Sequence, residues 1–415
     1  MTAVIREIWF LSRDRAALVW LLIAVIAAGC SVTFGLGEIA SQRATIERLE
    51  TADQAEQTYM AQAHRDWGSA GYYTFHLTYD PPSDFAFAAL GQRDASPWKH
   101  RIRMLALEGQ IYETDAANPD FALTGRFDYA FVVAILSPLF LILLLHDLKA
   151  RERAAGRFEL LEASGSGLWR VRAGLRVGTL GMALVLPLLM AGIISGSRAG
   201  PLLFGSAAVL IHLLFWWGVI AWINQRGWTA TVNLTTLFGA WLVLAVLAPA
   251  GIKLAVDTAI TVPDGGDIIL TQREAVNDAW DLPVSATMEP FLERHPDWAD
   301  YATIEGAFEW KWYYAFQQVG DQTAEDLSLA YRAGRDRRDR VSSILSWLTP
   351  PAKLERVFQS LANTDVEATR EYEDRVRAFH ADLRAYYYPN LFMDLPFTDE
   401  TLSERPGYSA TPQTE

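Results

Sequence analysis

Five long apolar runs divide the chain and predict its organisation. Each run contains roughly 20 residues, which in a helix rising about 1.5 Å per residue matches the roughly 30 Å hydrocarbon core of a membrane. The runs are residues 16–37, 129–145, 177–194, 201–223 and 228–252. The pattern therefore predicts an α-helical polytopic membrane protein with about five transmembrane helices.

The first apolar run, residues 16–37, has three interpretations. A cleaved secretory signal would suit its length, but a front segment that contains Asp14 is long for such a signal. The residues before Cys30 hint at a lipoprotein signal, although the usual leucine before the small pair is missing. Since four more apolar runs follow, we favour an uncleaved first transmembrane helix.

Proline occurs inside three of the runs, at Pro138, Pro187 and Pro249. Proline lacks the N–H that would bond to a carbonyl of the preceding turn. A membrane helix tolerates this loss because neighbouring groups satisfy the freed carbonyl. Only residues 195–200 join the third and fourth runs, so these two helices are predicted to form a tight hairpin.

Residues 38–128 are polar and aromatic and are predicted to form a mixed α/β domain with a modest core of its own. Residues 38–64 contain few helix breakers, so the first membrane helix is expected to continue through them. Residues 72–79 alternate in polarity and end at a turn that contains two prolines, which is typical of a strand. A second strand is predicted at 101–106.

The region after the fifth run, residues 253–406, is predicted to be mostly helical, and the tail 407–415 to be disordered. Residues 341–361 combine a short apolar run with an amphipathic stretch, and we expect them to lie in the membrane surface. If they crossed the membrane instead, the C-terminus would change sides. The predicted helices cover residues 297–319, 323–348 and 367–388.

Lysine and arginine in the short connecting segments predict the orientation, because such residues accumulate on the cytoplasmic side. The hairpin at 195–200 carries only Arg198. The segment 146–176 and the N-terminal tip, residues 1–15, are much more basic. Their basic residues are Arg6, Arg13, Arg15, Lys149, Arg151, Arg153, Arg157, Arg170, Arg172 and Arg176. The tip and the 146–176 loop are therefore predicted to be cytoplasmic, and the 38–128 and 253–406 regions extracytoplasmic.

Composition and motifs exclude several classes of function. The net charge of −13 argues against a nucleic-acid partner. The single cysteine, Cys30, excludes an intrachain disulfide framework and a thiolate metal cluster. The chain contains no G-x-x-x-x-G-K-[ST], H-E-x-x-H, C-x-x-C or G-x-S-x-G motif. We therefore predict no catalytic residues, no metal site and no cofactor bound by this chain, which would not be an enzyme.

His212 lies in the fourth run and is the one histidine with a claim to function, since ionisable groups inside a membrane often face a transport pathway. The simpler interpretation, a neutral histidine hydrogen-bonded between helices, is favoured over the pathway. Two aromatic clusters, 310–314 and 386–388, are interpreted mainly as packing or anchoring groups. The arginine-rich run 332–340 is either a solvated helix face or a contact with lipid head groups.

The loop between the second and third runs carries the strongest functional pattern. Residues 147–162 can form a helix with both signs of charge on successive turns, and a Ser-Gly-Ser-Gly break follows at 164–167. A short helix lying across the membrane face can dock in a groove of a partner protein. An ordinary solvated loop that obeys the positive-inside bias is the alternative.

Residues 147–161 resemble the D-x-x-x-x-E-x-x-x-G-T-x-x-L-L segment of ABC-2 type permeases, with Arg157 where threonine is common. Further short segments resemble the bacterial multi-copper-enzyme-maturation permease group, which carries an uncharacterised C-terminal domain. These segments are residues 89–94, 97–98, 125–128, 348–350, 361–365 and 388–392. The group label does not establish copper as cargo, because the chain has seven methionines, one cysteine and no metal-ligand cluster.

The resemblance implies the permease subunit of an ATP-driven transporter in the bacterial inner membrane, exporting or extracting an unidentified substrate. ATP would bind to a separate ABC ATPase subunit, and a second permease subunit, identical or different, would complete the assembly beside membrane lipid. Glu152 and its neighbours would bear the docking contacts, and Gly156 would permit close approach. The implied coupling residues are Asp147, Arg151, Glu152, Arg153, Gly156 and Glu159.

A different class of function is also compatible with the residues. A non-transporting membrane scaffold or sensor could bind a partner through its extracytoplasmic domains. Co-purification of an ATPase with the tagged chain, or a neighbouring gene that encodes a phosphate loop, would favour the transporter.

Overall fold

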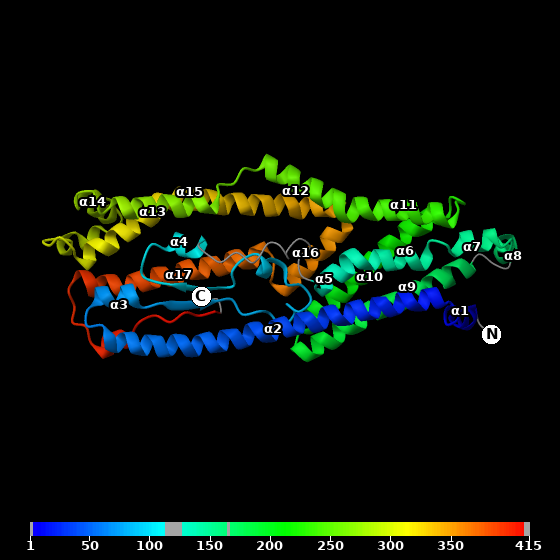
Figure 1. The fold of residues 1–415 in the computed structure, drawn as a ribbon, viewed down its shortest axis with the longest axis horizontal. Coiled ribbons are helices and arrows are strands. Elements are labelled where there is room, and N and C mark those ends of the chain that lie inside the picture. The colour runs from blue at the N-terminus through cyan, green and yellow to red at the C-terminus, as the bar shows by residue number, and fades with distance from the viewer. Residues whose placement is uncertain (1–2, 113–126, 164–166, 411–415) are drawn as a thin grey trace.

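The structure is a computed structural model that describes residues 3–112, 127–163 and 167–410. The described chain is mostly helical and forms an elongated bundle with two halves (Figure 1). One half contains the apolar helices, and five helices are long and apolar enough to cross a membrane. We call its tip, where α1 (Ala3–Leu11) lies, the loop end, and we call the other half the distal half.

Helix α2, Arg15–Ala63, joins the two halves as a single helix of 49 residues, which at about 1.5 Å per residue is roughly 73 Å long. It begins where the side chain of Asp14 accepts a hydrogen bond from the backbone N–H of Ala17. Its first part is apolar and its second part polar, so one rod leaves the membrane half and enters the distal half. The predicted continuation of the first span through residues 38–64 is confirmed.

The other four predicted spans also coincide with long apolar helices, although residues 228 and 229 precede the last one, so the expected number of helices long and apolar enough to cross a membrane is confirmed. The candidate spans cover Tyr129–Ala154, Gly167–Ser195, Ala199–Asn224 and Ala230–Ala259. The first comprises α5 (Tyr129–Phe131), a π-helical turn (Val132–Leu136), α6 (Ser137–Leu145) and α7 (Leu148–Ala154). The next two are α9 (Gly167–Ser195) and α10 (Ala199–Asn224). The last comprises α11 (Ala230–Leu242), a π-helical turn (Val243–Leu247) and α12 (Ala248–Ala259).

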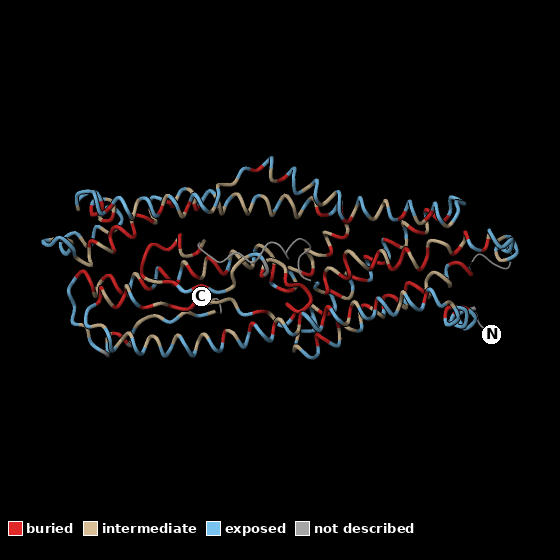
Figure 2. The backbone as a smooth tube through the Cα atoms, viewed as in Figure 1, coloured by how far each residue is buried: buried red, intermediate tan, exposed pale blue. Residues whose placement is uncertain are grey.

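The second span is the centre of the membrane half and the fifth is its periphery. In the most apolar 18-residue window, 67% of the second span is buried but only 11% of the fifth. Leu141 and Leu144 of the second span pack with Leu180 of α9 and Leu213 of α10 in one core. Figure 2 shows that buried positions gather on the inner helices and where the two halves meet. The outer faces of the spans are apolar and exposed, as expected of a surface that contacts lipid.

Side chains satisfy the carbonyls that Pro138 and the preceding π-helical turn leave free. Ser137 Oγ donates to the carbonyl of Val133 at 2.6 Å, and Trp241 Nε1 of α11 donates to the carbonyl of Ile135 at 2.9 Å. The expected compensation by neighbours is therefore observed at this proline.

The distal half contains a two-stranded antiparallel sheet, β1 (His76–Tyr79) and β2 (Lys99–Ile102). The predicted first strand is too long, because its first two residues end helix α3 (Trp67–Tyr73), which the side chain of Asp66 caps. The predicted second strand, 101–106, is displaced. It stops at Ile102 because the next backbone N–H donates to the side chain of Gln110 at 2.8 Å instead of a neighbouring strand.

Helices between 5 and 36 residues long form most of the distal half. They are α4 (Leu107–Tyr112), α13 (Gly265–Asp278), α14 (Ser285–Arg294), α15 (Trp310–Leu345), α16 (Pro350–Ala362), α17 (Val366–Phe392) and α18 (Asp399–Ser403). Short 3-10 turns cover Gly91–Asp94, Pro296–Tyr301 and Ser346–Leu348. The predicted helix at 367–388 is confirmed by α17. The helix predicted at 297–319 is broken before Trp310: the 3-10 turn Pro296–Tyr301 is followed by a loop, in which residues 305 and 306 donate their backbone N–H groups to the side chain of Glu309.

The two polar regions of the chain share one distal core. Trp67 and Ile102 from the first region pack in the same cluster as Phe291, Phe316 and Val376 from the second. The first region was expected to have a core of its own. In the structure its buried apolar residues share a core with those of α15 and α17.

The segment 341–361 turns at the junction of the halves and does not continue to the loop end (Figure 1). Phe358 of α16 is buried against Gly205 of α10 and Tyr129 of the second span. Ile344 and Trp347, just before α16, are 70% and 72% exposed. This arrangement suits a segment lying at a membrane surface, with apolar side chains on one face and the distal half on the other.

The tail was predicted to be disordered, which is wrong for residues 407–410. Tyr408 donates its hydroxyl to the carbonyl of Tyr79 at 2.9 Å, and its ring packs on Phe379. Residues 411–415 lie outside the described part of the chain.

Gly35 of α2 provides a test of how the halves meet. A Cβ atom at Gly35 would overlap the backbone carbonyl of Phe87, whereas one at Gly29 in the same helix would meet nothing within 4 Å. We expect Gly35→Ala to destabilise the protein by about 1–3 kcal/mol because two backbones must separate. Thermal unfolding of the purified chain in detergent measures this effect. Gly29→Ala is the control and should be neutral or slightly stabilising; equal melting temperatures for the two variants would refute the close contact.

Candidate functional site

The predicted coupling loop folds as two short helices at the loop end. Helix α7 continues the second span, and α8 (Phe158–Ala163) follows after a reversal at Gly156. Gly156 has φ +69°, a left-handed conformation that glycine adopts at low cost. The N–H of Arg157 donates to the carbonyl of Glu152 at 3.0 Å and closes the turn. Gly156 thus supplies a turn.

Glu152 lies inside the loop end. Only 8% of the residue is exposed, and its two carboxylate oxygens accept hydrogen bonds from Arg157 Nε at 2.9 Å and Arg172 Nη1 at 3.1 Å. Arg172 also donates to Glu7 of α1 at 2.8 Å. Glu152 therefore holds α7, α9 and α1 together, and its carboxylate faces arginines of its own chain.

A second ion-pair group lies beside the first, around Asp14. Arg176 donates to Asp14 at 2.8 Å and to the carbonyl of Leu144 at 2.7 Å. Arg151 lies 3.6 Å from Asp14 and 3.7 Å from Asp147. The loop, the first span and the third span are tied together by these contacts.

Two further predicted residues lie nearer the surface. The guanidinium of Arg153 stacks over the ring of Phe158 at 4.4 Å, which joins α7 to α8. Glu159 is exposed and points away from the core. Of the six predicted coupling residues, five thus take part in the loop's own structure, and Glu159 is free to meet a partner.

The most exposed apolar side chain of the loop was missed by the sequence reasoning. Leu160 of α8 is 75% exposed, and no residue of α8 is buried. An exposed leucine beside Glu159 and Glu162 on a short helix gives an apolar centre with an acidic rim. Leu160 and Leu161, which end the 147–161 segment, could have indicated this exposure. Neighbouring residues of a helix point in different directions, so one short helix cannot turn both leucines toward the same core.

His212, the candidate pathway residue, is buried between helices and 4% exposed. Its ring lies edge-on to Trp216, with 6.4 Å between ring centroids. Its Nε2 is buried without a hydrogen-bond partner among the described residues, so the interpretation of a histidine hydrogen-bonded between helices stays a prediction. Within residues 3–112, 127–163 and 167–410, no three His, Cys, Asp or Glu side chains are grouped to hold a metal ion.

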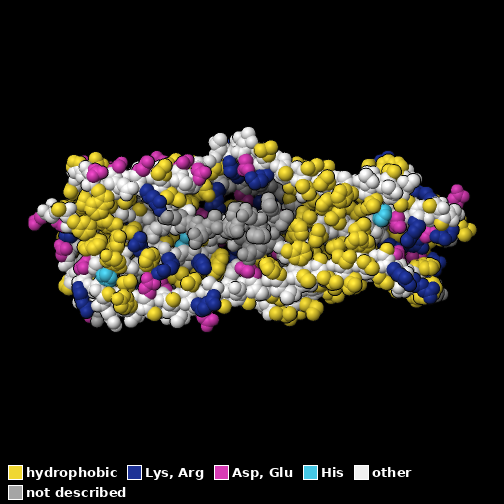
Figure 3. All heavy atoms as spheres, in the orientation of Figure 1, with side chains coloured by type: hydrophobic (Ala, Val, Ile, Leu, Met, Phe, Trp, Pro, Cys, Tyr) yellow, Lys and Arg dark blue, Asp and Glu magenta, His cyan; other side chains and the backbone are white. Residues whose placement is uncertain are grey.

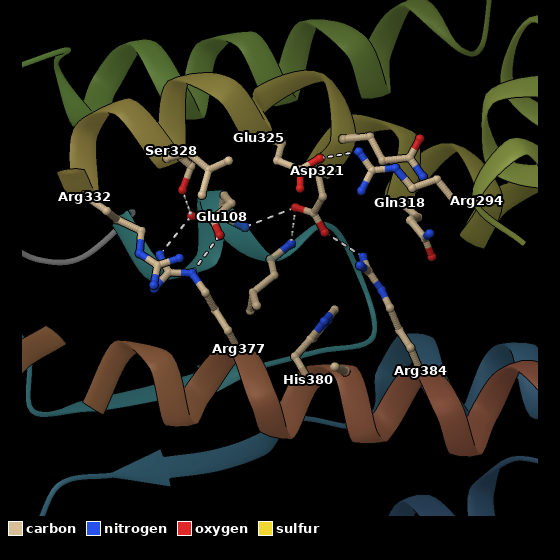
Figure 4. Close-up of a pocket in the computed structure, with 14 residues that line it drawn as sticks. Glu108, Arg294, Gln318, Asp321, Glu325, Ser328, Arg332, Arg377, His380 and Arg384 are labelled. Atoms are coloured by element: carbon tan, nitrogen blue, oxygen red, sulfur yellow. Dashed lines mark hydrogen bonds and ion pairs between the residues drawn. The ribbon is translucent and has the colours of Figure 1, made fainter. Parts of the chain in front are cut away.

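The distal half contains a charged cavity of about 290 Å³ between α4, α15 and α17 (Figure 4). Arg377 pairs with Glu108 at 2.9 Å, and Arg384 pairs with Asp321 at 2.6 Å. Burial raises the pKa of Asp321. Burial acts in the same direction on Glu108, but the Arg377 guanidinium outweighs it and lowers the pKa of Glu108. The groups neutralise one another, which is typical of an internal network that fixes helix positions.

Arginines of the 332–340 run belong largely to the same kind of network. Arg335 pairs with Glu373 of α17 at 3.0 Å, and Arg338 Nε donates to the carbonyl of Ile260 after α12 at 2.9 Å. The expectation of a solvated face is wrong for these two positions. The aromatic clusters pack as expected: Tyr314 donates to the carbonyl of Gly68 at 2.8 Å.

Comparison with protein families gives one match. A family described as "Domain of unknown function (DUF3526)" matches residues 268–411, a little over a third of the chain. The match covers most of α13 and the helices that follow it, and does not include the loop end. Neither the curated proteins nor the solved structures contain a match.

A carboxyl pair lies where α16 meets the start of the second span. Asp128 caps α5, accepting from the N–H of Phe131 at 2.8 Å, and also accepts from the N–H of Leu90 at 3.1 Å. Burial and the negative charge of Asp128 raise the pKa of Glu355 to about 7. Glu355 is therefore the group at this junction whose charge changes near neutral pH.

The paired carboxylate of Glu152 predicts a loss of stability on substitution. In Glu152→Gln, Arg157 loses its anionic partner and Arg172 keeps only Glu7, and we expect a cost of about 1–3 kcal/mol. Glu159→Gln, on the exposed face of the neighbouring helix, should cost less than about 0.5 kcal/mol. Thermal unfolding in detergent distinguishes the two. Equal melting temperatures would mean that Glu152 does not hold the loop end together.

Glu355 predicts a pH dependence. Its folded pKa of about 7 exceeds the ordinary value of 4.5, so the stability it contributes is complete below pH 4.5 and lost as pH rises to 7. At roughly 1.4 kcal/mol per pKa unit, Glu355→Gln should be more stable than wild type at pH 8 by up to about 3 kcal/mol. Melting temperatures across pH 5–8 test this expectation, with the exposed Glu371→Gln as control. A variant curve parallel to that of the wild type would contradict it.

Proposed function

We propose that this chain is the membrane-spanning permease subunit of an ABC-2 type transporter, driven by a separate ATPase subunit. The observation that carries the proposal is the exposed Leu160 on a two-helix loop whose residues resemble the coupling segment of that family. The chain lacks a phosphate loop of its own, so the energy source would be another protein. An apolar side chain with an acidic rim suits insertion into a groove of that protein.

The ion pairs behind the docking surface supply a means of transmitting force. Glu152 and Arg172 connect the loop to α9 and α1, and Arg176 connects α9 to the end of the second span. A displacement of α8 would therefore move three spans together. Because α2 is one rod through both halves, the same displacement would reach the distal half.

In this proposal the chain lies in the bacterial inner membrane, with its N-terminus and the 146–176 loop in the cytoplasm. The distal half, with its small sheet and long helices, is the extracytoplasmic part that receives or releases the substrate. The peripheral fifth span, only 11% buried in its most apolar window, leaves an apolar face for a second permease subunit or for lipid. Export or extraction of an unidentified substrate would follow from nucleotide-driven closure of the ATPase pair.

Co-purification with a matched pair of variants tests the proposal. A tagged chain isolated from its native membrane should bring down a protein with a phosphate loop, and adding the chain should stimulate that protein's ATP hydrolysis. Leu160→Arg should lower the recovered ATPase at least about tenfold, since burying a charge in an apolar contact costs more than about 1.4 kcal/mol. Leu270→Arg on α13, where the leucine is 56% exposed in the distal half, is the control and should leave recovery unchanged.

The outcomes separate the two classes of function. Loss of the ATPase with Leu160→Arg but not with Leu270→Arg supports coupling through α8. Recovery of only extracytoplasmic partners with the wild-type chain, and no ATPase, would replace the transporter with a scaffold or sensor.

A further inference from the structure

A cavity of about 780 Å³ lies at the loop end between α1, the α7–α8 loop and α9. Its wall is strongly basic, with six arginines against three carboxylates, an excess of three positive charges. The arginines are Arg13, Arg15, Arg151, Arg157, Arg172 and Arg176. The charged cavity of the distal half has four arginines against three acids, an excess of only one positive charge.

The three carboxylates of the cavity already have partners within the chain. Arg172 lies between Glu7 and Glu152, and Arg176 and Arg151 share Asp14. Among the described residues, neither Arg13 nor Arg15 forms an ion pair with a carboxylate, and Arg13 stacks over the ring of Trp9 at 3.4 Å. Both side chains are in exposed residues. The positive excess therefore belongs to groups that can meet an external anion.

The rest of the cavity wall is apolar and adjoins the membrane half. Phe10 and Leu11 of α1, Leu161 of α8 and Leu175 of α9 line it. Helix α1 exposes several large apolar side chains, each between 45% and 49% exposed: Val4, Ile5, Ile8, Trp9 and Phe10. A helix with such a face lies in the interfacial layer of a membrane. Figure 3 shows that the basic side chains of the loop end adjoin the broad apolar band of the spans.

We propose that this cavity binds the phosphate of an anionic phospholipid drawn from the leaflet in which α1 lies. Guanidinium groups bind phosphate oxygens through paired, charge-assisted hydrogen bonds. Basic pockets between membrane helices on the cytoplasmic side are suited to anionic head groups. Arg13 and Arg15 make the first contacts, the half-exposed Arg151 adds a third charge, and the acyl chains lie along the apolar wall.

An acidic surface of a partner protein would use the same arginines but would gain nothing from the apolar wall beside α1. The lipid uses both parts of the cavity, and for that reason the observations favour it. The proposal depends on the loop end lying at a membrane face and not on any ATPase. It therefore stands or fails independently of the transporter assignment.

The test uses the purified full-length chain in detergent, titrated with phosphatidylglycerol and, separately, with phosphatidylcholine, and followed by native mass spectrometry. The double variant Arg13→Gln/Arg15→Gln should bind phosphatidylglycerol at least about tenfold more weakly, since each basic residue near the head group contributes roughly a factor of five. Its binding of phosphatidylcholine should be unchanged, which shows that the apolar wall is intact.

Arg226→Gln is the matched control. Arg226 follows α10 at the same end of the molecule and stacks over Trp222 at 4.3 Å, as Arg13 does over Trp9, but it is not part of the cavity wall. Its replacement should leave phosphatidylglycerol binding at the wild-type level. An equal loss in the control and in the double variant would reduce the effect to general surface charge and overturn the proposal.

Two further results would also overturn the proposal. Displacement of phosphatidylglycerol by millimolar inorganic phosphate would define a site for a free anion instead of a lipid. Wild-type lipid binding by the double variant, together with loss of a co-purified partner protein, would assign the arginines to a protein interface. Thermal unfolding of each variant confirms that it is folded, and Arg15→Gln alone provides a second variant with a milder expected loss.

Discussion

The position of the buried segment 85–90 constrains both halves of the molecule. Its residues are no more than 2% exposed, so their backbone polar groups cannot reach water and need partners inside the protein. Ala88 accepts from the N–H of Ala130 at 2.8 Å, and Ala89 accepts from the hydroxyl of Thr364 at 3.0 Å. Gly35 lets α2 approach the same segment. The first span, the second span and the end of α16 are thereby connected through one segment, which joins the membrane half to the distal half.

Ion pairs, rather than backbone hydrogen bonds, connect the spans at the loop end, so the spans are connected to one another at both of their ends. At the junction, backbone hydrogen bonds in an apolar setting fix the spans; at the loop end, arginine–carboxylate pairs do so. Arg172 and Arg176, one turn apart on α9, reach α1, α7, Asp14 and the second span. The spans are thus held at both ends, as the proposed transmission of force from the loop to the distal half would require.

Much of this architecture could be predicted from the sequence, because a membrane span and a long helix are properties of neighbouring residues. The five spans and the continuation of α2 are examples. The shared distal core could not be predicted, since Trp67 and Phe316 meet only after the whole chain has folded. The burial of Glu152 was missed for the same reason: Arg172 is 20 positions away, and Glu7 much farther. A helical charge pattern identifies a candidate surface, but the pairing decides which side chains remain available to a partner.

The distribution of charge links orientation to binding. A count of basic residues gives every arginine near the loop end the same weight. The side chains of Arg172 and Arg176, however, are only 12% and 8% exposed, and the chain's own acids neutralise them. Arg13 and Arg15 are exposed and are in excess. Because the whole chain carries a net charge of −13, an excess of positive charge at this end requires a larger excess of negative charge elsewhere. The field of the protein therefore favours anionic lipid at the loop end, so the residues that predict which side of the membrane this end occupies are also those that can retain it there.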